Sequence, residues 1–547
     1  MGYKGTTLNI PAIGGWNATY NVENIPPGSL TISKNINLHN GGYEPRGGTS
    51  KFNSSVITDN PRVMGAYHYN VGSTSKIIAY TAVGGTVKDK IYEVGAAGVV
   101  GSVLETVTNG ITKYPSFASY NYVTYICNGY DTIQTFNGTT CSDLSAPHAD
   151  WGANDQPIQL IKHGAGNSER LWAVGTTGTP GFIYYSQDND GVLEASFTAS
   201  GSGRIFIDTG DKYGLTGAIE YQDRLMVFGK NTTYILDDSS GDVNDWGYVQ
   251  AGWFGGCATF RLAVATPNDV FCMTDDGEIY SVTAAQSYGD YKSASITKPA
   301  GIDVWIKDNV DMTYVKDFHA IYDYQMKAIK WFVVRTANTS HQVDTCLVFY
   351  TDREPSIAWT LHDNLSANIN GYNASCSFYV KDTDNKIKVY TGDWGGTLKG
   401  TLWNTEQSSY ADNSTAYEVK LKTPRISVGG ENGISDPRRT KRFQALRVID
   451  QNFLNATYFG IKIYIDGTFH NNLSYGYSRG ASGFILGTSI LGTGTLSSDK
   501  SEFIEYIAEI GNFGRKIEVE IGNNSQNNVY FFISAMMLDY RPITVGV

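Results

Sequence analysis

The stretch "RLWAVGTTGTPGFIYYSQDNDG", residues 170–191, alternates apolar and polar residues on both sides of a break at Gly178 and Pro180. Alternation with a period of two is typical of a half-buried β-strand, and Gly and Pro mark turns. The segment therefore predicts a β-hairpin. Its last six residues, SQDNDG, predict the turn that follows, because Asp and Asn side chains bond to their own backbone there.

Two other interpretations of SQDNDG stay open. Asp188, Asn189 and Asp190 offer the clustered oxygens that a calcium ion prefers, although no Glu stands where an EF-hand loop has its twelfth ligand. The sialidase pattern S-x-D-x-G-x-T-W is nearly matched by Ser186, Asp188 and Gly191, but the Gly is displaced by one residue and the Thr-Trp pair is missing. Turn chemistry is the simplest of the three interpretations.

Similar strand-turn-strand units recur from about residue 61 to residue 403. Each has an apolar strand, a turn of Gly, Asn or Asp, and a returning strand, and successive landmarks are 45 to 59 residues apart: Ile77, Tyr122, Leu171, Leu225, Val270, Ile329 and Phe378. A β-rich repeat of about 40 to 50 residues is typical of a propeller, in which four-stranded blades pack around an axis. The sequence predicts an all-β protein with a propeller of about seven blades.

Composition supports many short strands. The 547 residues include 60 Gly and 37 Tyr, and only 17% of them are charged. Glycine permits the turns that need positive φ, and tyrosine fits a pleated, half-buried surface. With 41% hydrophobic residues, the chain has enough apolar material for a substantial core.

The formal net charge of −11 bears on partners. Tight nucleic-acid binding normally needs a basic surface, because phosphate contacts supply most of the affinity. The charge therefore argues against a tight DNA or RNA binder. It still permits DNA to pass nearby, since an acidic or neutral wall does not hold a polyanion.

The regions on either side of the repeats differ in texture. Residues 1–60 contain no convincing repeat and are expected to form an arm that docks onto the ring. Residues 404–416 are polar and predict a linker, and 417–547 contain longer alternating strands, which predict a β-sandwich platform. Within the platform, the Gly-rich apolar segment 480–498 is either a hairpin or loop, or a contact surface for a neighbouring subunit.

No catalytic or cofactor motif stands out. The eight histidines show no HxH or HExxH spacing, the six cysteines form no CxxC pair, and there is no P-loop, GxSxG or GxGxxG fingerprint. Strand-borne carboxylates such as Glu278 and Asp323 are expected to face solvent. We therefore expect no enzyme activity, no cofactor and no metal motif.

One basic cluster stands just before a strand. In a chain of net charge −11, it is a candidate contact for an acidic surface of a neighbouring subunit. Its basic residues are Arg438, Arg439, Lys441 and Arg442.

Taken in order, several segments resemble the tail nozzle proteins of short-tailed bacteriophages (podoviruses), also called tail tubular or stabilisation proteins. The N-terminal segment "SKNINLHNGGYEPRGGTSKF" (33–52) resembles that family's first motif. The hairpins beginning at Arg170, Ile207 and Gly256 and the segments "GRKIEVEIGN" and "VYFFISAMMLDYRP" follow in the family's order. In the first motif the matching residues are Asn37, Leu38, Gly41, Gly42, Arg46 and Gly47.

The resemblance implies a virion structural protein. It implies a propeller with a β-rich platform, assembled as a homohexamer below a tail adaptor protein, with needle, fibre or spike proteins attached. The ring would form the distal tail tube through which double-stranded DNA is ejected, without insertion into a membrane. The chain would be made in the host cytoplasm, as the lack of an apolar signal segment also suggests.

Two alternatives remain open. The first is a glycan-binding or glycan-degrading propeller, such as a receptor-binding or spike-like protein, because aromatic rings stack on sugars. Its candidate aromatic residues are Trp172, Trp253, Trp331, Trp359 and Trp394, which would otherwise be core or edge packing. The second alternative is a secreted or cell-surface binding propeller, which the missing signal segment disfavours.

Overall fold

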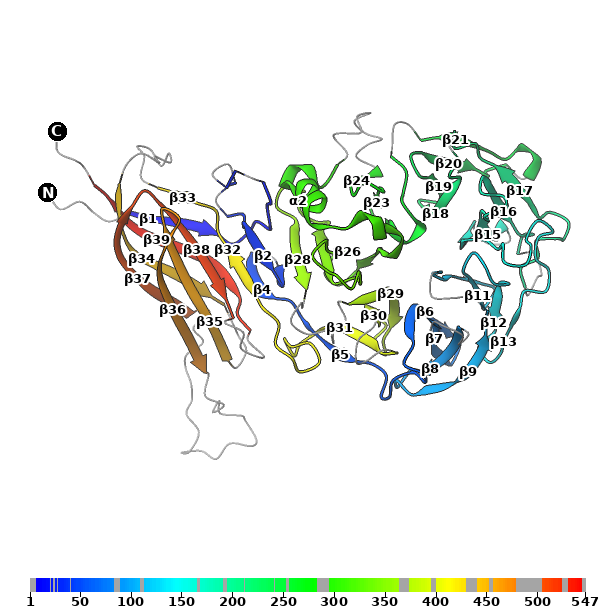
Figure 1. Cartoon of the computed structure of the whole chain (residues 1–547), viewed down its shortest axis with the longest axis horizontal. Helices are drawn as coiled ribbons and strands as arrows, with labels where there is room; N and C mark the ends of the chain where they lie inside the picture. Colours follow the sequence, from blue (N-terminus) through cyan, green and yellow to red (C-terminus); the bar gives the residue numbers. More distant parts are fainter. Residues whose placement is uncertain are drawn as a thin grey trace.

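Figure 1 shows the computed structural model, an elongated molecule with a ring of small sheets beside a two-layer β-sandwich. The structure describes residues 6–19, 21–22, 25–26, 28–39, 41–82, 89–108, 113–164, 168–189, 194–210, 212–240, 242–251, 255–282, 295–363, 373–394, 400–428, 440–451, 456–478, 504–523 and 530–543.

The described residues form seven antiparallel blade sheets, each numbered outward from the ring axis. The first blade contains β6(Arg62–Val71), β7(Thr74–Ala82), β8(Lys90–Gly95) and β9(Val100–Thr106), and the second contains β10(Ser116–Tyr120), β11(Val123–Cys127), β12(Gln134–Phe136) and β13(Cys141–Asp143). The third blade contains β14(Gln159–His163), β15(Arg170–Val174), β16(Phe182–Tyr185) and β17(Gly203–Phe206). The fourth contains β18(Leu215–Tyr221), β19(Arg224–Gly229), β20(Thr233–Asp237) and β21(Gly247–Gln250).

The last three blades complete the ring. They are β22(Ala263–Ala265), β23(Val270–Met273) and β24(Ile279–Ser281); β25(His319–Asp323), β26(Ala328–Val333), β27(Thr345–Tyr350) and β28(Trp359–Asp363); and β29(Ala374–Lys381), β30(Ile387–Asp393) and β31(Leu402–Gln407), with β5(Gly48–Lys51) as the outermost strand. Between the fifth and sixth blades the chain forms α2(Ile302–Asn309).

The ring closes on itself. Consecutive innermost strands contact one another, and the last, β29, contacts the first, β6. The seventh blade is closed by the N-terminal strand β5, which pairs antiparallel with β31. Strands distant in sequence thus hold the first and last blades together, and closure leaves only short edges exposed.

The predicted all-β propeller is confirmed, and each of the seven landmarks lies in a different blade. Only Phe378, on β29, marks a first strand, and Tyr122 lies in the turn between β10 and β11. Ile77, Leu171, Leu225, Val270 and Ile329 lie on the second strand of their blades. The innermost strands give a weaker apolar signal because they use small residues where blades converge: a Cβ at Gly65 of β6 would lie 2.5 Å from Pro115 of the next blade.

The sandwich consists of two facing sheets. One has the order β3(Ile36–His39), β4(Gly42–Pro45), β39(Ile533–Pro542), β34(Lys441–Asp450) and β37(Ile504–Gly514), with β1(Thr6–Pro11) also paired to β39. The other contains β32(Lys420–Lys422), β38(Lys516–Gly522), β35(Ala456–Ile465) and β36(Thr468–Ser478), with β33(Ile426–Ser427) beside β38. Phe459 of β35 packs edge-on against Tyr506 of β37, with ring centroids 4.8 Å apart, so the two layers share one core.

The sheets do not follow the boundaries expected at residues 60, 403 and 416. Strand β2(Ile32–Lys34) pairs with β28 of the sixth blade on one side and with β32 of the sandwich on the other, which makes one continuous sheet. The expected arm therefore contributes strands to the sandwich, the junction and the seventh blade. The expected linker begins inside β31, which runs to Gln407. The Gly-rich segment 480–498 lies outside the described residues.

Candidate functional site

Arg46 anchors the junction between the ring and the sandwich. Its side chain is fully buried, and its guanidinium donates to both carboxylate oxygens of Asp412, at 2.9 and 2.6 Å. Its Nε donates to Asn35 Oδ1 at 2.8 Å, and the guanidinium carbon lies 3.8 Å from the centre of the Tyr417 ring. Such a planar fork fits a carboxylate in two places at once, which a lysine cannot do.

The glycines of the same motif bring the backbone close to this junction. A Cβ on Gly47 would lie 2.5 Å from the backbone of Glu406, and one on Gly48 would lie 2.1 Å from the Ala411 carbonyl oxygen. Gly41 has a φ of +86°, which suits the turn between β3 and β4. The motif residues thus have a structural use, which is to pack the N-terminal segment between two domains.

A second group of buried charges lies beside Arg46. Lys330 of β26 donates to Asp323 Oδ2 and to Glu406 Oε1, both at 2.9 Å. The other oxygen of Glu406 accepts from the Gly47 backbone N–H at 2.9 Å. Glu406 therefore connects the N-terminal motif to the sixth and seventh blades.

Charges in this group keep Glu406 ionised. Burial alone would raise the pKa of the Glu406 carboxyl, but the nearby cations, Lys330 above all and also Arg46, outweigh burial and lower it to about 2. Burial lowers the pKa of His362 to about 3, so this histidine is neutral. A carboxylate that stays ionised suits ion pairing rather than proton donation.

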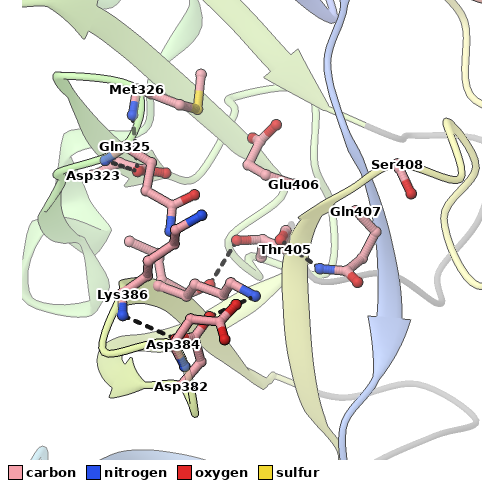
Figure 2. Close-up of a pocket in the computed structure, with 12 residues that line it drawn as sticks. Asp323, Gln325, Met326, Asp382, Asp384, Lys386, Thr405, Glu406, Gln407 and Ser408 are labelled. Atoms are coloured by element: carbon pink, nitrogen blue, oxygen red, sulfur yellow. Dashed lines mark hydrogen bonds and ion pairs between the residues drawn. The ribbon is translucent and has the colours of Figure 1, made fainter.

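A polar groove of about 350 Å³ opens beside these charges, between the sixth and seventh blades (Figure 2). It is formed by the β25–β26 turn, the β29–β30 turn and the end of β31. Its residues are Asp323, Gln325, Met326, Asp382, Asp384, Lys386, Lys388, Val389, Thr405, Glu406, Gln407 and Ser408. This groove is a candidate binding site, because side chains from three strand ends converge on it.

Short local bonds hold the groove walls. Asp323 Oδ1 accepts from the Gln325 N–H at 3.0 Å, and Asp382 accepts from the N–H groups of Asp384 and Lys386, each at 2.9 Å. Lys388 pairs with Asp382 at 3.0 Å. The groove thus presents amide, hydroxyl and carboxylate groups in fixed positions, a lining that can hydrogen-bond a polar ligand.

Asp323 corrects one sequence expectation. It was expected to face solvent, but it is buried because it is the counter-ion of the equally buried Lys330. Glu278, by contrast, pairs with the half-exposed Lys298. The roles of Lys330 and Glu406 were missed, since each is an isolated charge in an apolar strand whose partner lies on another strand.

At the ring axis, two arginines and two aromatic rings form a packed cluster where the inner strands begin. The Arg62 guanidinium carbon lies 3.2 Å from the Trp394 ring centre, and that of Arg261 lies 3.6 Å from the Tyr114 ring centre. Tyr114 donates to Asp317 at 2.8 Å. Burial lowers the pKa of Arg62, partly offset by Tyr114 and Asp317. The cluster joins side chains from several blades.

The four basic residues proposed as a subunit contact differ in what the structure shows of them. Arg438 and Arg439 lie outside the described residues. Lys441 is fully buried and donates to the Arg515 carbonyl at 3.3 Å, so its charge is not available to another subunit. Arg442 is exposed, with its guanidinium 5.8 Å from the Phe513 ring centre.

The SQDNDG turn shows what holds its acidic residues. Asp188 pairs at 3.3 Å with Arg170, which also donates to the carbonyls of Ser186 and Gly201. Asn189 donates to Glu169 at 3.3 Å. The Arg170 guanidinium already neutralises Asp188, which favours the interpretation of SQDNDG as a turn over a calcium site. Asp190 lies outside the described residues.

The tryptophans considered for sugar stacking are mostly core residues. Trp172, Trp331 and Trp359 are fully buried. Trp394 is covered by Arg62, and Trp253 lies outside the described residues. Stacking of sugars on the first three is therefore excluded.

Within the described part of the chain, no group of three or more His, Cys, Asp or Glu side chains is arranged to hold a metal ion. No helix there is long and apolar enough to span a membrane. All six cysteines are free, and five of them are buried.

Comparisons with known proteins identify no family for this chain. No family model and no curated protein matches the sequence. Similar solved structures include an exo-β-1,3-galactanase from Phanerochaete chrysosporium, at 8% identity and a TM-score of 0.27, covering 90% of this chain and 100% of that one. YCF48 bound to D1 peptide has 8% identity and a TM-score of 0.34, covering 67% and 96%.

PorZ from Porphyromonas gingivalis has 11% identity and a TM-score of 0.32, covering 78% of this chain and 46% of that one. None of these three structures is a tail protein. At such low identities and TM-scores, they transfer no activity or partner to this chain. The chain belongs to the class of all-β proteins that join a propeller to a β-sandwich, and its function is inferred from its own residues.

Proposed function

We propose that the chain is a structural subunit of a virion, the tail nozzle of a short-tailed phage, localised to the distal tube of the tail. The observation that carries the proposal is the use of the residues that resemble the nozzle family. Two of the matching residues, Arg46 and Gly47, lie with the neighbouring Gly48 at the point where the sandwich, the ring and the N-terminal segment meet. These residues hold the ring and the sandwich together. This use supports the proposal, because a tail component needs its domains held in a fixed relative position.

Further support comes from the continuous sheet through β28, β2 and β32, which joins ring and sandwich through backbone hydrogen bonds. In the proposed assembly, identical copies form a homohexameric ring around a channel, with the adaptor above and needle, fibre or spike proteins attached. The net charge of −11 would let double-stranded DNA pass without adhering.

Immunogold electron microscopy of virions that carry this gene tests the proposal. Antibodies raised against the purified chain should label the end of the tail, with no label on capsids. Labelling confined to the capsid, or absence of the chain from purified virions, would reject it.

The groove in Figure 2 favours a second candidate, glycan binding or degradation. Its volume of about 350 Å³ and its amide, hydroxyl and carboxylate lining suit one or two sugar units. The ionised Glu406 is poorly suited as the general acid that most glycosidases require, so binding is favoured over hydrolysis.

Polysaccharide binding and sugar release by the purified chain distinguish the two candidates. If the groove binds glycans, Gln325→Ala and Gln407→Ala should each weaken retention on host polysaccharide, whereas Gln222→Ala, in the exposed β18–β19 turn, should not. Absence of retention and of released sugars for the unaltered chain would remove this candidate.

A further inference from the structure

A pocket of about 400 Å³ opens where the N-terminal segment passes α2 and the sheet shared by ring and sandwich. Its walls come from residues 16–34, which include β2, from α2, from β28 and from the segment that follows β26. It shares no described lining residue with the groove of Figure 2. Its volume lies in the range of sites that bind small ligands.

Two tryptophan rings form an apolar corner of this pocket. Trp305 of α2 is half-buried and Trp16 is buried, and their ring centroids lie 5.1 Å apart with the ring planes at 81°. The Trp16 backbone is held by its N–H, which donates to the Trp359 carbonyl at 2.7 Å. Rings that are already ordered can receive the apolar face of a sugar ring at little cost in conformational entropy.

Two side-chain amides beside the rings each keep one polar atom for a ligand. Asn17 Oδ1 accepts from the Thr19 N–H at 3.1 Å, and Asn309 Nδ2 donates to the Trp305 carbonyl at 3.0 Å. Neither side-chain amide makes another hydrogen bond to a described residue, so Asn17 Nδ2 remains as a donor and Asn309 Oδ1 as an acceptor. A donor and an acceptor together suit sugar hydroxyl groups, which act as both.

The charged side chains that line the pocket are cations. Lys34 and Arg335 pair with the two oxygens of Asp363, at 3.2 and 3.1 Å, and Lys34 also pairs with Glu418 at 2.9 Å. Asp363 is fully buried, and neither carboxylate belongs to the lining. The described lining contains no Asp or Glu, so the pocket presents positive charge to a ligand.

Arg335 is held in a position to receive an anion. Its Nε donates to the Thr345 hydroxyl at 2.8 Å and its Nη2 to Asp363 at 3.1 Å, whereas its Nη1 bonds to no described residue. The guanidinium carbon lies 5.8 Å from the Trp305 ring centre. The cation and the apolar corner are therefore close enough for one small ligand to contact both.

We propose that this pocket binds an acidic sugar, a uronic or sialic acid unit of an anionic polysaccharide. Its carboxylate would bond to Arg335, and its apolar face would pack against Trp16 and Trp305. The amides and hydroxyls beside the rings favour a sugar over an acyl chain, and the two cations favour an acidic sugar over a neutral one. The inference rests neither on the tail-nozzle proposal nor on the groove of Figure 2.

A glycan array with uronic and sialic acid units beside neutral glycans of equal length tests the proposal, with the intact purified chain as the probe. The chain should bind at least one acidic glycan about tenfold or more tightly than its neutral counterpart. Absence of binding, or equal binding of acidic and neutral counterparts throughout the array, would overturn the proposal.

Titration calorimetry with the acidic glycan that binds most tightly assigns binding to the pocket. Trp305→Ala and Arg335→Gln should each weaken binding by about tenfold or more, and Arg335→Gln should also remove the preference for the acidic glycan. Lys34 still pairs with Asp363 in Arg335→Gln, so that variant leaves no buried carboxylate without a counter-ion. Trp246→Ala, which removes a half-buried tryptophan just before β21, is the matched control and should retain the affinity.

The groove variants Gln325→Ala and Gln407→Ala separate the two sites and should also retain the affinity. Loss of binding in these variants but not in Arg335→Gln would overturn the proposal and assign the sugar to the groove. Melting curves followed by circular dichroism show which variants are folded. If Trp305→Ala does not fold, Arg335→Gln decides: unchanged affinity and unchanged preference for the acidic glycan would contradict the proposal.

Discussion

At the residue scale, buried charges in complementary sets hold the parts of this molecule together. Arg46 with Asp412, and Lys330 with Asp323 and Glu406, lie inside the structure with both signs present. Such pairs add little net stability compared with apolar packing. Removing one partner is nevertheless strongly destabilising, because it leaves the other charge buried without a counter-ion. These residues therefore specify how the segments fit rather than supply most of the folding energy.

Replacing Arg46 tests this interpretation. Arg46→Ala should destabilise the chain by about 3–5 kcal/mol, because it leaves the buried Asp412 carboxylate without its partner. Arg46→Lys should recover only part of the loss. Arg442→Ala, an exposed control, should change stability by less than about 0.5 kcal/mol. Chemical denaturation measures all three, and a loss for Arg46→Ala no larger than for Arg442→Ala would contradict the role given to the ion pair.

His163 makes the stability of the third and fourth blades depend on pH. Burial lowers its pKa, but the carboxylates of Asp238, at 3.1 Å, and Glu220, at 3.6 Å, outweigh burial and raise the pKa to about 9. Because the folded-state pKa is above the unfolded value of about 6.5, its contribution is complete below pH 6.5 and is lost as the pH rises through 9.

The melting temperature should therefore fall by about 2–4 °C more between pH 6.5 and 9.5 for the unaltered chain than for His163→Gln. Differential scanning calorimetry at several pH values measures this difference. Parallel curves for the two proteins would show that His163 carries no such contribution.

Lys441 shows how a residue's place was misread from the sequence. A run of basic residues suggested a contact with a neighbouring subunit, but Lys441 shares a strand face with Phe443, which is fully buried. The period of two in β34 held the correct signal. The pairing of Lys330 with Asp323 and Glu406 had no such signal, since the counter-ions come from separate strands.

At the element scale, the hairpins of the blades were predictable from the sequence, but the distant short strands that pair with them were not. Alternation and turn residues located all seven blades because a hairpin is a local structure. Strands β2 and β5 have only three and four residues, and they pair with strands more than 300 positions away. A periodicity of so few residues carries no information about distant partners, so the expected arm was in fact an integral part of three sheets.

Closure by β5 can be tested with one substitution. Gly48→Val should disrupt the pairing of β5 with β31, because its Cβ would lie 2.1 Å from the Ala411 carbonyl oxygen. Limited proteolysis should then cut the N-terminal segment many-fold faster than in the unaltered chain. Gly152→Ala, where no atom lies within 4 Å of the added Cβ, is the matched control. Equal cleavage rates in Gly48→Val and Gly152→Ala would argue against closure by β5.

At the scale of the whole molecule, the ring and the sandwich form one body through a shared sheet (Figure 1). The all-β propeller was predictable from repeats, and a strand-rich platform from longer alternating segments. The groove between the last two blades was not predictable, because it combines residues from different blades. A hexameric tail tube remains our proposal for how such rigid subunits are used.

The most direct test of that proposal is a cryo-electron microscopy map of the tail of a virion that carries this gene. We predict that six copies of the structure, each with its ring and sandwich in the relation shown in Figure 1, fit the distal tube around a central channel. A tube built from another protein, with this chain elsewhere or absent from the particle, would contradict it.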